Sequence, residues 1–432
     1  MSDKDTIDLQ ALKINGVYRS NANDDLMLRV KLPAGVLSAL QARTISELAA
    51  EFAGGRLHLT TRGNVELHGL RGEQLPVIFR RLHGVGLTTR GACGGAVRAV
   101  ACSTDGGNFD RIQLLVERLH RHFTGNPHFE GLPKKFKLAV ENGYEGARHL
   151  CQDLTLVYLG REGERELCDL WVAGGLGRQP QEAFLLANRV PLERLLSLVE
   201  GVVRVYMQHA PAGKRLKHLL AEIGEQEFRA LLAKETAGSA PLPLASPLED
   251  QLGVAIAPGT QGWIELPVSA GELAAEDLNR AAVIANENGD GYLAISREQN
   301  LLVSLGADVD ESALRNALSQ ASLLPEEPFL RCRACPGNHE CPKGLIPTRD
   351  QVRQLENALG PQGKKLCWAV SGCPNGCSQP QLADYAIVGV RKATEKQEAR
   401  YDLLHRDGEG FGQPLRTGLS EAELLEVLRG IG

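Results

Sequence analysis

The chain has 432 residues, of which 43% are hydrophobic and 23% are charged, and its formal net charge is −5. This composition is ordinary for a globular protein of two or three domains, and the charge gives no reason to expect nucleic acid or an anionic membrane as main partner. The start, MSDKDTIDLQ, lacks the pattern of a secretory signal, and no stretch approaches the roughly 18 unbroken apolar residues of a membrane span. We therefore expect a cytoplasmic protein with no membrane insertion and no nucleic-acid partner.

The first part of the chain alternates strand and helix patterns. Residues 26–35, LMLRVKLPAG, predict a strand that meets a turn, and residues 36–55 have apolar side chains at helical spacing before a Gly-Gly stop. Residues 56–70 predict a strand pair, and residues 73–86 predict a second helix. This order indicates a small α+β layer.

The same layout recurs later in the chain. Residues 252–263, 275–291, 292–306 and 311–324 repeat the order of elements, and overlaying the two strand pairs places Arg297 opposite Arg62. A duplicated half-domain is the simplest interpretation. Between the copies lies a long α/β region with helical patterns, and residues 237–247, with three prolines and no charge, predict a linker.

Cysteines gather in the last quarter of the sequence. Six of the ten lie between Cys332 and Cys377. Ten cysteines are too few in so long a chain for a disulfide scaffold. Two short pairs, Cys335-x5-Cys341 and Cys373-x3-Cys377, predict four thiolates around one metal centre. Zinc favours two-residue gaps, which only Cys332-x2-Cys335 offers, whereas an iron–sulfur cluster tolerates wider ones. Both metals remain open on spacing alone.

The two cysteine motifs resemble the cluster motif of the sirohaem-containing sulfite and nitrite reductases, C-x5-C followed by G-C-P-N-x-C. The resemblance implies that a [4Fe–4S] cluster is bound by Cys335, Cys341, Cys373 and Cys377. It also implies that Cys377 bridges to the sirohaem iron and that Asn375 lies against the sirohaem. Cys332 ranks second to Cys335 as a ligand, because only Cys335 gives the five-residue gap.

Basic residues stand where this family has its anion-binding residues. LMLRVKLPAG resembles the strand whose Arg faces the substrate, LTTRGNVELHG the strand that meets sirohaem carboxylates, and TTRGACGGAVRAV and LPKKFKLAV two further active-site segments. The sequence departs from the family where Gly63 replaces a Gln and where Val97 and Ala99 replace asparagines. The implied catalytic residues are Arg29, Arg98, Lys135 and Lys137, and the implied cofactor contacts are Arg62, Asn64 and His68.

The resemblance implies an α+β fold in which duplicated ferredoxin-like half-domains combine with two α/β nitrite/sulfite-reductase-type domains. The half-domains would span residues 1–89 and 248–325. The sirohaem and substrate domain would span residues 90–236, the linker 237–247, and the cluster and sirohaem domain 326–432.

The implied function is reduction of sulfite to sulfide, or of nitrite to ammonia, with six electrons from an external donor. The chain shows no flavin or nicotinamide fingerprint, so we expect a separate ferredoxin or flavoprotein to supply them. Lys137 favours sulfite, because plant-type nitrite enzymes tend to carry Asn there. Two alternatives remain: an oxygenase like precorrin-3B synthase, whose usual second motif has Ala-Lys at Pro374-Asn375, and a zinc-stabilised binding protein without enzymatic activity.

Overall fold

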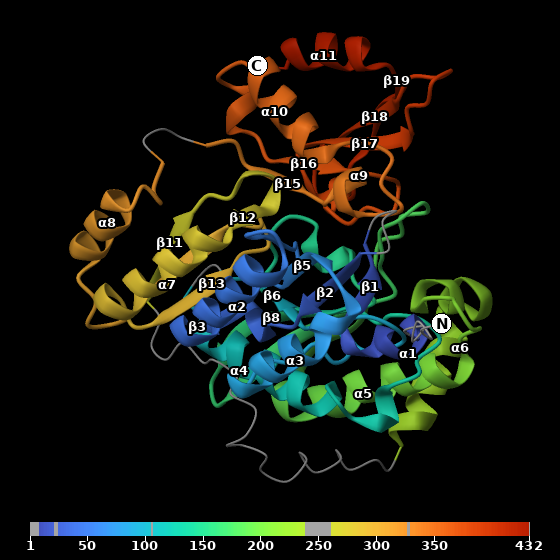
Figure 1. The fold of residues 1–432 in the computed structure, drawn as a ribbon. Coiled ribbons are helices and arrows are strands. Elements are labelled where there is room, and N and C mark those ends of the chain that lie inside the picture. The colour runs from blue at the N-terminus through green and yellow to red at the C-terminus, as the bar shows by residue number, and fades with distance from the viewer. Residues whose placement is uncertain (1–7, 21–24, 105–106, 238–260, 326–328, 432) are drawn as a thin grey trace, which may run out of the picture.

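A computed structural model describes residues 8–431 except 21–24, 105–106, 238–260 and 326–328. The predicted linker therefore lies, from residue 238 onward, outside the described residues. In Figure 1 the cysteine-rich region (orange to red) is at the top, the two half-domain layers (blue and yellow) are in the middle, and helices α5 and α6 (green) are at the bottom. The observed α+β architecture agrees with the expected fold class.

The first half-domain is a sheet covered by two helices. Its strand order is β1 (Val17–Arg19), β2 (Leu26–Val30), β5 (Val65–Leu70), β4 (Arg56–Leu59) and β12 (Glu272–Ala274). Helices α2 (Ala39–Phe52) and α3 (Leu75–Gly84) match the predicted helices. Ser38 begins α2 with a capping box, its hydroxyl accepting the Gln41 amide while the Gln41 side chain accepts the Ser38 amide.

The second half-domain repeats this arrangement and exchanges a strand with the first. Its sheet has the order β11 (Gly262–Leu266), β14 (Leu301–Leu305), β13 (Tyr292–Ile295) and β3 (Val36–Ser38), with helices α7 (Ala275–Asn288) and α8 (Glu311–Gln320). Strand β3 comes from the first copy, whereas β12 of the second copy pairs with β4 of the first. Side chains of both copies form one continuous apolar core.

The hairpin turns of the two copies have the same backbone hydrogen bonds. The side-chain oxygen of Asn64 accepts from the Leu32 amide, and that of Asn300 accepts from the Val268 amide, each at 3.0 Å. Because both asparagines also sit at the same point of their hairpins, directly before β5 and β14, they are structural equivalents.

This equivalence corrects the overlay made from the sequence. Counting back from the two asparagines, Arg62 corresponds to Glu298, and Arg297 corresponds to Thr61. The predicted pairing of Arg62 with Arg297 is therefore wrong by one position. The residue before each asparagine adopts a left-handed conformation in both copies, with φ 68° at Gly63 and φ 65° at Gln299.

Two further five-stranded sheets share one topology, with the first three strands parallel and the last two antiparallel. The first contains β6 (Ala101–Cys102), β7 (Leu138–Asn142), β8 (Leu154–Glu162), β9 (Arg165–Val172) and β10 (Phe184–Pro191). The second contains β15 (Cys332–Ala334), β16 (Trp368–Ser371), β17 (Tyr385–Arg391), β18 (Arg400–His405) and β19 (Gln413–Leu419). The duplication thus extends beyond the half-domains to the α/β units.

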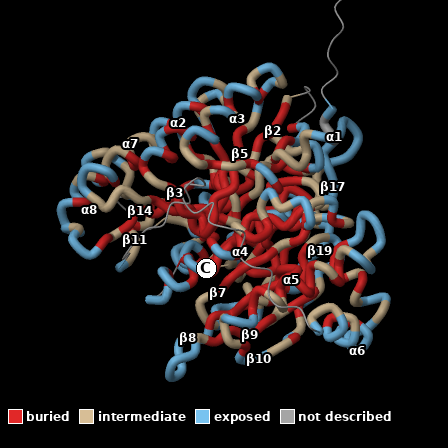
Figure 2. Tube along the Cα trace, turned by 90° about the horizontal axis from the view of Figure 1, so that it is seen from below, coloured by how far each residue is buried: buried red, intermediate tan, exposed pale blue. Residues whose placement is uncertain are grey.

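Helices flank both α/β sheets. The first unit has α4 (Phe109–Phe123), α5 (Leu192–His209) and α6 (Leu216–Thr236), and the second has the short α9 (Gly337–Glu340), α10 (Thr348–Ala358) and α11 (Glu421–Arg429). Figure 2 shows the buried segments gathered at the centre, with the outer parts of helices such as α6 and α8 exposed. Within the described ranges, no helix has the length and apolarity to cross a membrane.

Candidate active site

The four predicted cysteine ligands lie beyond the ends of two neighbouring parallel strands. Cys335 directly follows β15, and Cys373 and Cys377 follow β16, which pairs with β15 in parallel. The carboxyl ends of parallel strands meet at one edge of a sheet, so the two motifs come together there. Cys341 directly follows the short helix α9, which leads back to the same edge.

The thiols influence one another and accept backbone hydrogen bonds. Burial raises the pKa of Cys335, and the nearby Cys377 and Cys373 raise it further, while the Gly372 amide, 3.1 Å from the Cys335 sulfur, opposes the shift. Burial also raises the pKa values of Cys341 and Cys373, and the charge of Cys377 raises both further. Amides of Lys343 and Asn375 donate to Cys341 and Cys373 respectively. Amides aimed at sulfurs are typical of iron–sulfur sites.

Cys332 and the four predicted ligands have different surroundings. Among the residues that the structure describes, no three His, Cys, Asp or Glu side chains are arranged to hold one metal ion. Cys332 is buried, and burial raises its pKa to about 12, with Arg333, Glu298 and Glu356 as its charged neighbours rather than the other thiols. The site therefore brings together the four predicted cysteines and leaves Cys332 apart.

Arg29 is held by a carboxylate on the adjacent strand. Arg29 of β2 lies opposite Glu66 of β5, and Glu66 accepts from Nε at 2.9 Å and from Nη2 at 2.5 Å of the guanidinium. Burial alone would lower the pKa of Arg29, but the charge of Glu66 raises it overall, and Cys377 adds to the rise. Arg29 thus remains charged, fixed in orientation and within electrostatic reach of Cys377.

Arg98, Lys135 and Lys137 lie on two adjacent extended segments of the first α/β unit. The Arg98 amide donates to the Phe136 carbonyl at 2.8 Å, which places Arg98 beside the segment that carries both lysines. Burial lowers the pKa of Lys135 to about 8, Cys377 opposes the shift, and Arg98 adds to it. Burial, followed by the charge of Lys135, lowers the pKa of Lys137 well below its usual value. Lys135 and Lys137 therefore lie within electrostatic range of Cys377, and Arg98 lies on the neighbouring segment of the same unit.

Arg62 and Lys31 extend this positive region. Burial and the charge of Arg297 lower the pKa of Arg62 to about 9, while its guanidinium donates to Gln152 Oε1 at 2.9 Å. Lys31 is 1% exposed, and burial with the charges of Arg98 and Arg62 lowers its pKa to about 7.

Most of these cations have no counter-ion in the part of the chain that the structure describes. Among the described residues, an ion pair is formed by none of Lys31, Arg62, Arg98, Lys135 and Lys137. Buried charges are stable only when they are paired, so this concentration of cations calls for anionic ligands. Sirohaem, with its carboxylates, and a small oxyanion both have the required charge. The residues present therefore fit sirohaem beside the cysteines.

The remaining predicted contacts lie in three different places. Asn375 is exposed in the turn between Cys373 and Cys377. Asn64 is 3% exposed, and its amide donates to the Arg62 carbonyl at 3.3 Å, so it holds the turn that carries Arg62. His68 points to Glu66, with its Nε2 3.2 Å from Glu66 Oε2.

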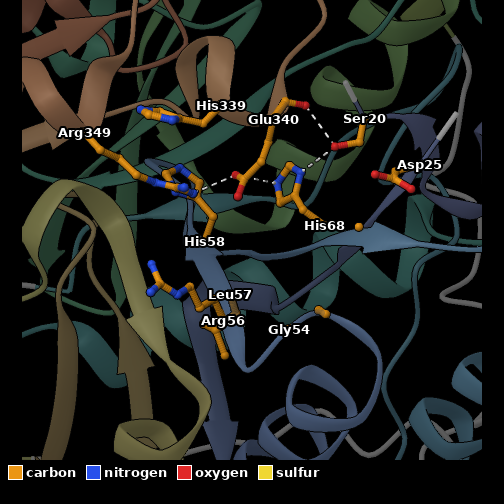
Figure 3. Close-up of a pocket in the computed structure, with 12 residues that line it drawn as sticks. Ser20, Asp25, Gly54, Arg56, Leu57, His58, His68, His339, Glu340 and Arg349 are labelled. Atoms are coloured by element: carbon orange, nitrogen blue, oxygen red, sulfur yellow. Dashed lines mark hydrogen bonds and ion pairs between the residues drawn. The ribbon is translucent and has the colours of Figure 1, made fainter. Parts of the chain in front are cut away.

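His68 also lines a pocket of about 450 Å³. Figure 3 shows Glu340 between His68 and Arg349, and Ser20 donates to the Glu340 carbonyl at 2.9 Å. Arg349 pairs with Glu340 at 2.7 Å and with Glu272 at 2.8 Å, and Glu272 also pairs with Arg56 at 2.6 Å. The arginines here are already neutralised, in contrast to the cations near Cys377.

Several functional neighbours were not identified from the sequence. They are Lys31, Glu66, Asp153 and Arg215, of which Asp153 and Arg215 form a buried ion pair at 2.8 Å. Asp153 also accepts the Lys137 amide at 2.8 Å, which fixes the backbone beneath that lysine. In a strand, residues two apart lie on the same face. The pairs Arg29-x-Lys31 and Glu66-x-His68 could therefore have indicated Lys31 and Glu66.

Known proteins resemble this chain over most of its length. It is 28% identical over 390 residues to a sulfite reductase (ferredoxin) of Mycobacterium tuberculosis, covering 84% of this chain and 69% of that protein. It is 29% identical over 441 residues to a ferredoxin–nitrite reductase of Synechococcus elongatus, covering 93% and 85% respectively. The solved structure of the NirA protein of Mycobacterium tuberculosis has the same fold, with a TM-score of 0.80 and 24% identity, covering 97% of this chain and 85% of that one.

Two family models match separate parts of the chain. Residues 18–85 match the nitrite/sulfite reductase ferredoxin-like half domain, and residues 98–239 match the nitrite and sulphite reductase 4Fe-4S domain. The second match contains Arg98, Lys135 and Lys137, whereas the four cysteines lie in the second α/β unit, which has the same sheet topology. The cofactors of this family are a [4Fe–4S] cluster and sirohaem. The chain thus carries two domains of the nitrite and sulfite reductase family.

Proposed function

We propose that the protein reduces sulfite to sulfide with six electrons supplied by reduced ferredoxin. The unpaired Lys135 and Lys137 near Cys377 carry this proposal, because a small oxyanion and an acidic tetrapyrrole both need such cations. The two relatives described above are named for ferredoxin, which favours ferredoxin over a flavoprotein as the donor. When bound, the cluster and sirohaem supply the electron transfer that no side chain can provide.

The side chains have separate roles in this proposal. Cys335, Cys341, Cys373 and Cys377 would hold the cluster, and Arg62 would bind the carboxylates of the sirohaem. Arg29 and Arg98 bind the substrate oxygens as permanently charged donors. Lys135 and Lys137, whose pKa values are lowered by burial, bind the anion and donate protons as its oxygens leave.

Nitrite is the second candidate substrate, since named relatives of both kinds match the chain. Lys137 favours sulfite because two adjacent ammonium groups suit an anion that must lose three oxygens, whereas nitrite loses two. Asn at this position would remove one charge and one proton donor.

A pair of lysine variants tests the choice of substrate. Sulfite and nitrite turnover with reduced methyl viologen should be measured for wild type, for Lys137→Asn, and for Lys134→Asn as the control. Lys134 is exposed and three positions away, so its variant should behave like wild type. We expect Lys137→Asn to lower sulfite turnover more than nitrite turnover. Equal losses would remove the preference for sulfite, and a purified protein without a tetrapyrrole absorption spectrum, although sirohaem was supplied, would refute the reductase proposal.

A further inference from the structure

The turn at Glu298–Gln299 places a residue with a side chain in a left-handed backbone conformation that its counterpart occupies with glycine. Gln299 has φ 65°, in the left-handed region, whereas the equivalent residue of the first half-domain is glycine. A residue with a Cβ in this region costs about 1 kcal/mol or more and persists only where its surroundings hold it. The side chain of Gln299 therefore makes contacts that glycine could not provide.

Gln299 binds the backbone of the first cysteine motif. Its Oε1 accepts from the Ala334 amide at 2.8 Å, and its Nε2 donates to the Ala334 carbonyl at 2.8 Å. Nε2 also donates to the Leu59 carbonyl of β4. The Gln299 side chain is 1% exposed, and Ala334 directly precedes Cys335. One side-chain amide thus fixes the strand end from which Cys335 extends, and ties it to the first half-domain.

The neighbouring Glu298 acts on the second cysteine motif through Arg333. The Glu298 oxygens lie 2.7 and 2.8 Å from Nη1 of Arg333, and Nε of Arg333 donates at 3.2 Å to the carbonyl of Ser378, the residue after Cys377. Arg148 of the first α/β unit also donates to Glu298 at 2.7 Å. Burial would raise the pKa of Glu298, but Arg333 and Arg148 lower it to about 2, so the carboxylate stays charged.

We infer that the Glu298–Gln299 turn positions the two cysteine motifs against each other. Gln299 fixes the backbone before Cys335, and Glu298, through Arg333, fixes the backbone after Cys377. Both residues are positioning residues, because neither touches a thiol. The inference rests on the assignment of these cysteines to the cluster and is independent of whether sulfite or nitrite is the substrate. The turn therefore links the backbone before Cys335 to the backbone after Cys377.

The decisive variant is Gln299→Gly, which copies the first half-domain. Glycine relieves the left-handed strain while removing the side chain and its hydrogen bonds, so a loss of function cannot come from backbone strain. Ser322→Gly is the matched control, since Ser322 also has positive φ, at 56°, and follows α8 in a different part of the fold. Glu298→Gln is a second variant that preserves size but removes the charge facing Arg333.

Holoprotein of each variant should be compared by iron content, by the electron paramagnetic resonance spectrum of the reduced protein, and by the midpoint potential of the cluster. Replacing the residues that support metal ligands typically lowers metal affinity or activity by about 10- to 100-fold. We expect Gln299→Gly to lose iron or to change both the spectrum and the potential. Its kcat should fall about tenfold or more with KM unchanged. Ser322→Gly should match wild type.

Two outcomes would overturn the inference. The first is a Gln299→Gly protein with wild-type iron content, spectrum and potential. The second is a Glu298→Gln protein that keeps these properties, which decides the question if Gln299→Gly does not fold. Neither measurement uses a substrate, so failure of the proposed reaction would be seen separately, as absent sulfite and nitrite turnover in a protein with an intact cluster.

Discussion

Glu66 faces Arg29 across the β2–β5 pair and accepts two hydrogen bonds from its guanidinium, one from Nε and one from Nη2. The other Glu66 oxygen lies 3.2 Å from His68. The carboxylate therefore fixes the direction of Arg29, whose Nη1 also donates to the Ala92 carbonyl at 3.1 Å. An arginine held in this way is already oriented before substrate arrives.

Replacing Glu66 with Gln should weaken turnover through Arg29. The neutral amide keeps the size of the carboxylate but loses the charge and one acceptor, so Arg29 shifts within the site. We expect kcat/KM for the oxyanion to fall about 10- to 100-fold, as small misplacements of catalytic groups do. Glu47→Gln, which removes a carboxylate from an exposed pair with Arg81, is the control and should leave turnover unchanged. An unchanged kcat/KM in Glu66→Gln would show that Arg29 does not need this anchor.

Serine variants of two nearby cysteines distinguish the cluster ligands. Cys335 interacts with the other thiols, whereas Cys332 is buried among different neighbours. We expect Cys335→Ser to lose cluster iron and its visible absorption, and Cys332→Ser to retain both. Iron and sulfide analysis with an absorption spectrum measures the difference. If Cys332→Ser lost the cluster and Cys335→Ser kept it, Cys332 rather than Cys335 would be the ligand.

Lys31 should make stability depend on pH above neutrality. Burial, followed by the charges of Arg98 and Arg62, lowers the pKa of Lys31 in the folded state to about 7, well below its ordinary value. Glu130 opposes this shift, and His120 also lies nearby. Below pH 7 the folded protein carries the full cost of the buried charge. Between pH 7 and the unfolded pKa only the unfolded state binds this proton, so the contribution of Lys31 to the free energy of unfolding rises with pH.

Thermal unfolding of wild type and Lys31→Met checks this sign. The melting temperature of the methionine variant relative to wild type should be highest at or below pH 7 and should decline as pH rises toward 10. Other titrating groups act on both proteins alike and cancel in the comparison. A difference that is constant across this range would mean that Lys31 does not titrate there.

The buried pair of Asp153 and Arg215 should be important for stability. Asp153 is 0% exposed, and removal of one partner of a buried ion pair typically costs about 3–5 kcal/mol. We therefore expect Asp153→Asn to lower the free energy of unfolding by about this amount, and to loosen the backbone of Lys137. Asp277→Asn, at an exposed pair with Arg280, is the control. Equal melting temperatures for the two variants would contradict the expectation.

The sequence was most informative where spacing alone carries the chemistry. The two cysteine gaps pointed to four thiols, and the structure brings these together at one sheet edge. The order of strands and helices predicted both half-domains, because amphipathic periods are local properties. Their extension to a duplicated α/β sheet topology agrees with the expected pair of α/β domains.

Contacts between distant segments could not be predicted in this way. Alternating patterns tolerate a shift of one residue in a turn, so Arg62 was aligned with Arg297 rather than with Glu298. The left-handed backbone of Gln299 is equally invisible, since glutamine has no preference for it. The partners Glu66 and Asp153 carry no motif, and only the strand register and the fold bring them to Arg29 and Arg215.

The exchange of strands between the half-domains has a consequence during translation. The edge of β4 is completed by β12, and Arg56 and Glu272, which pair there, are 216 residues apart. An open strand edge is a template for pairing with other chains. The nascent chain therefore carries an incomplete sheet on the ribosome until the second copy emerges, and half of the duplication expressed alone should aggregate rather than fold.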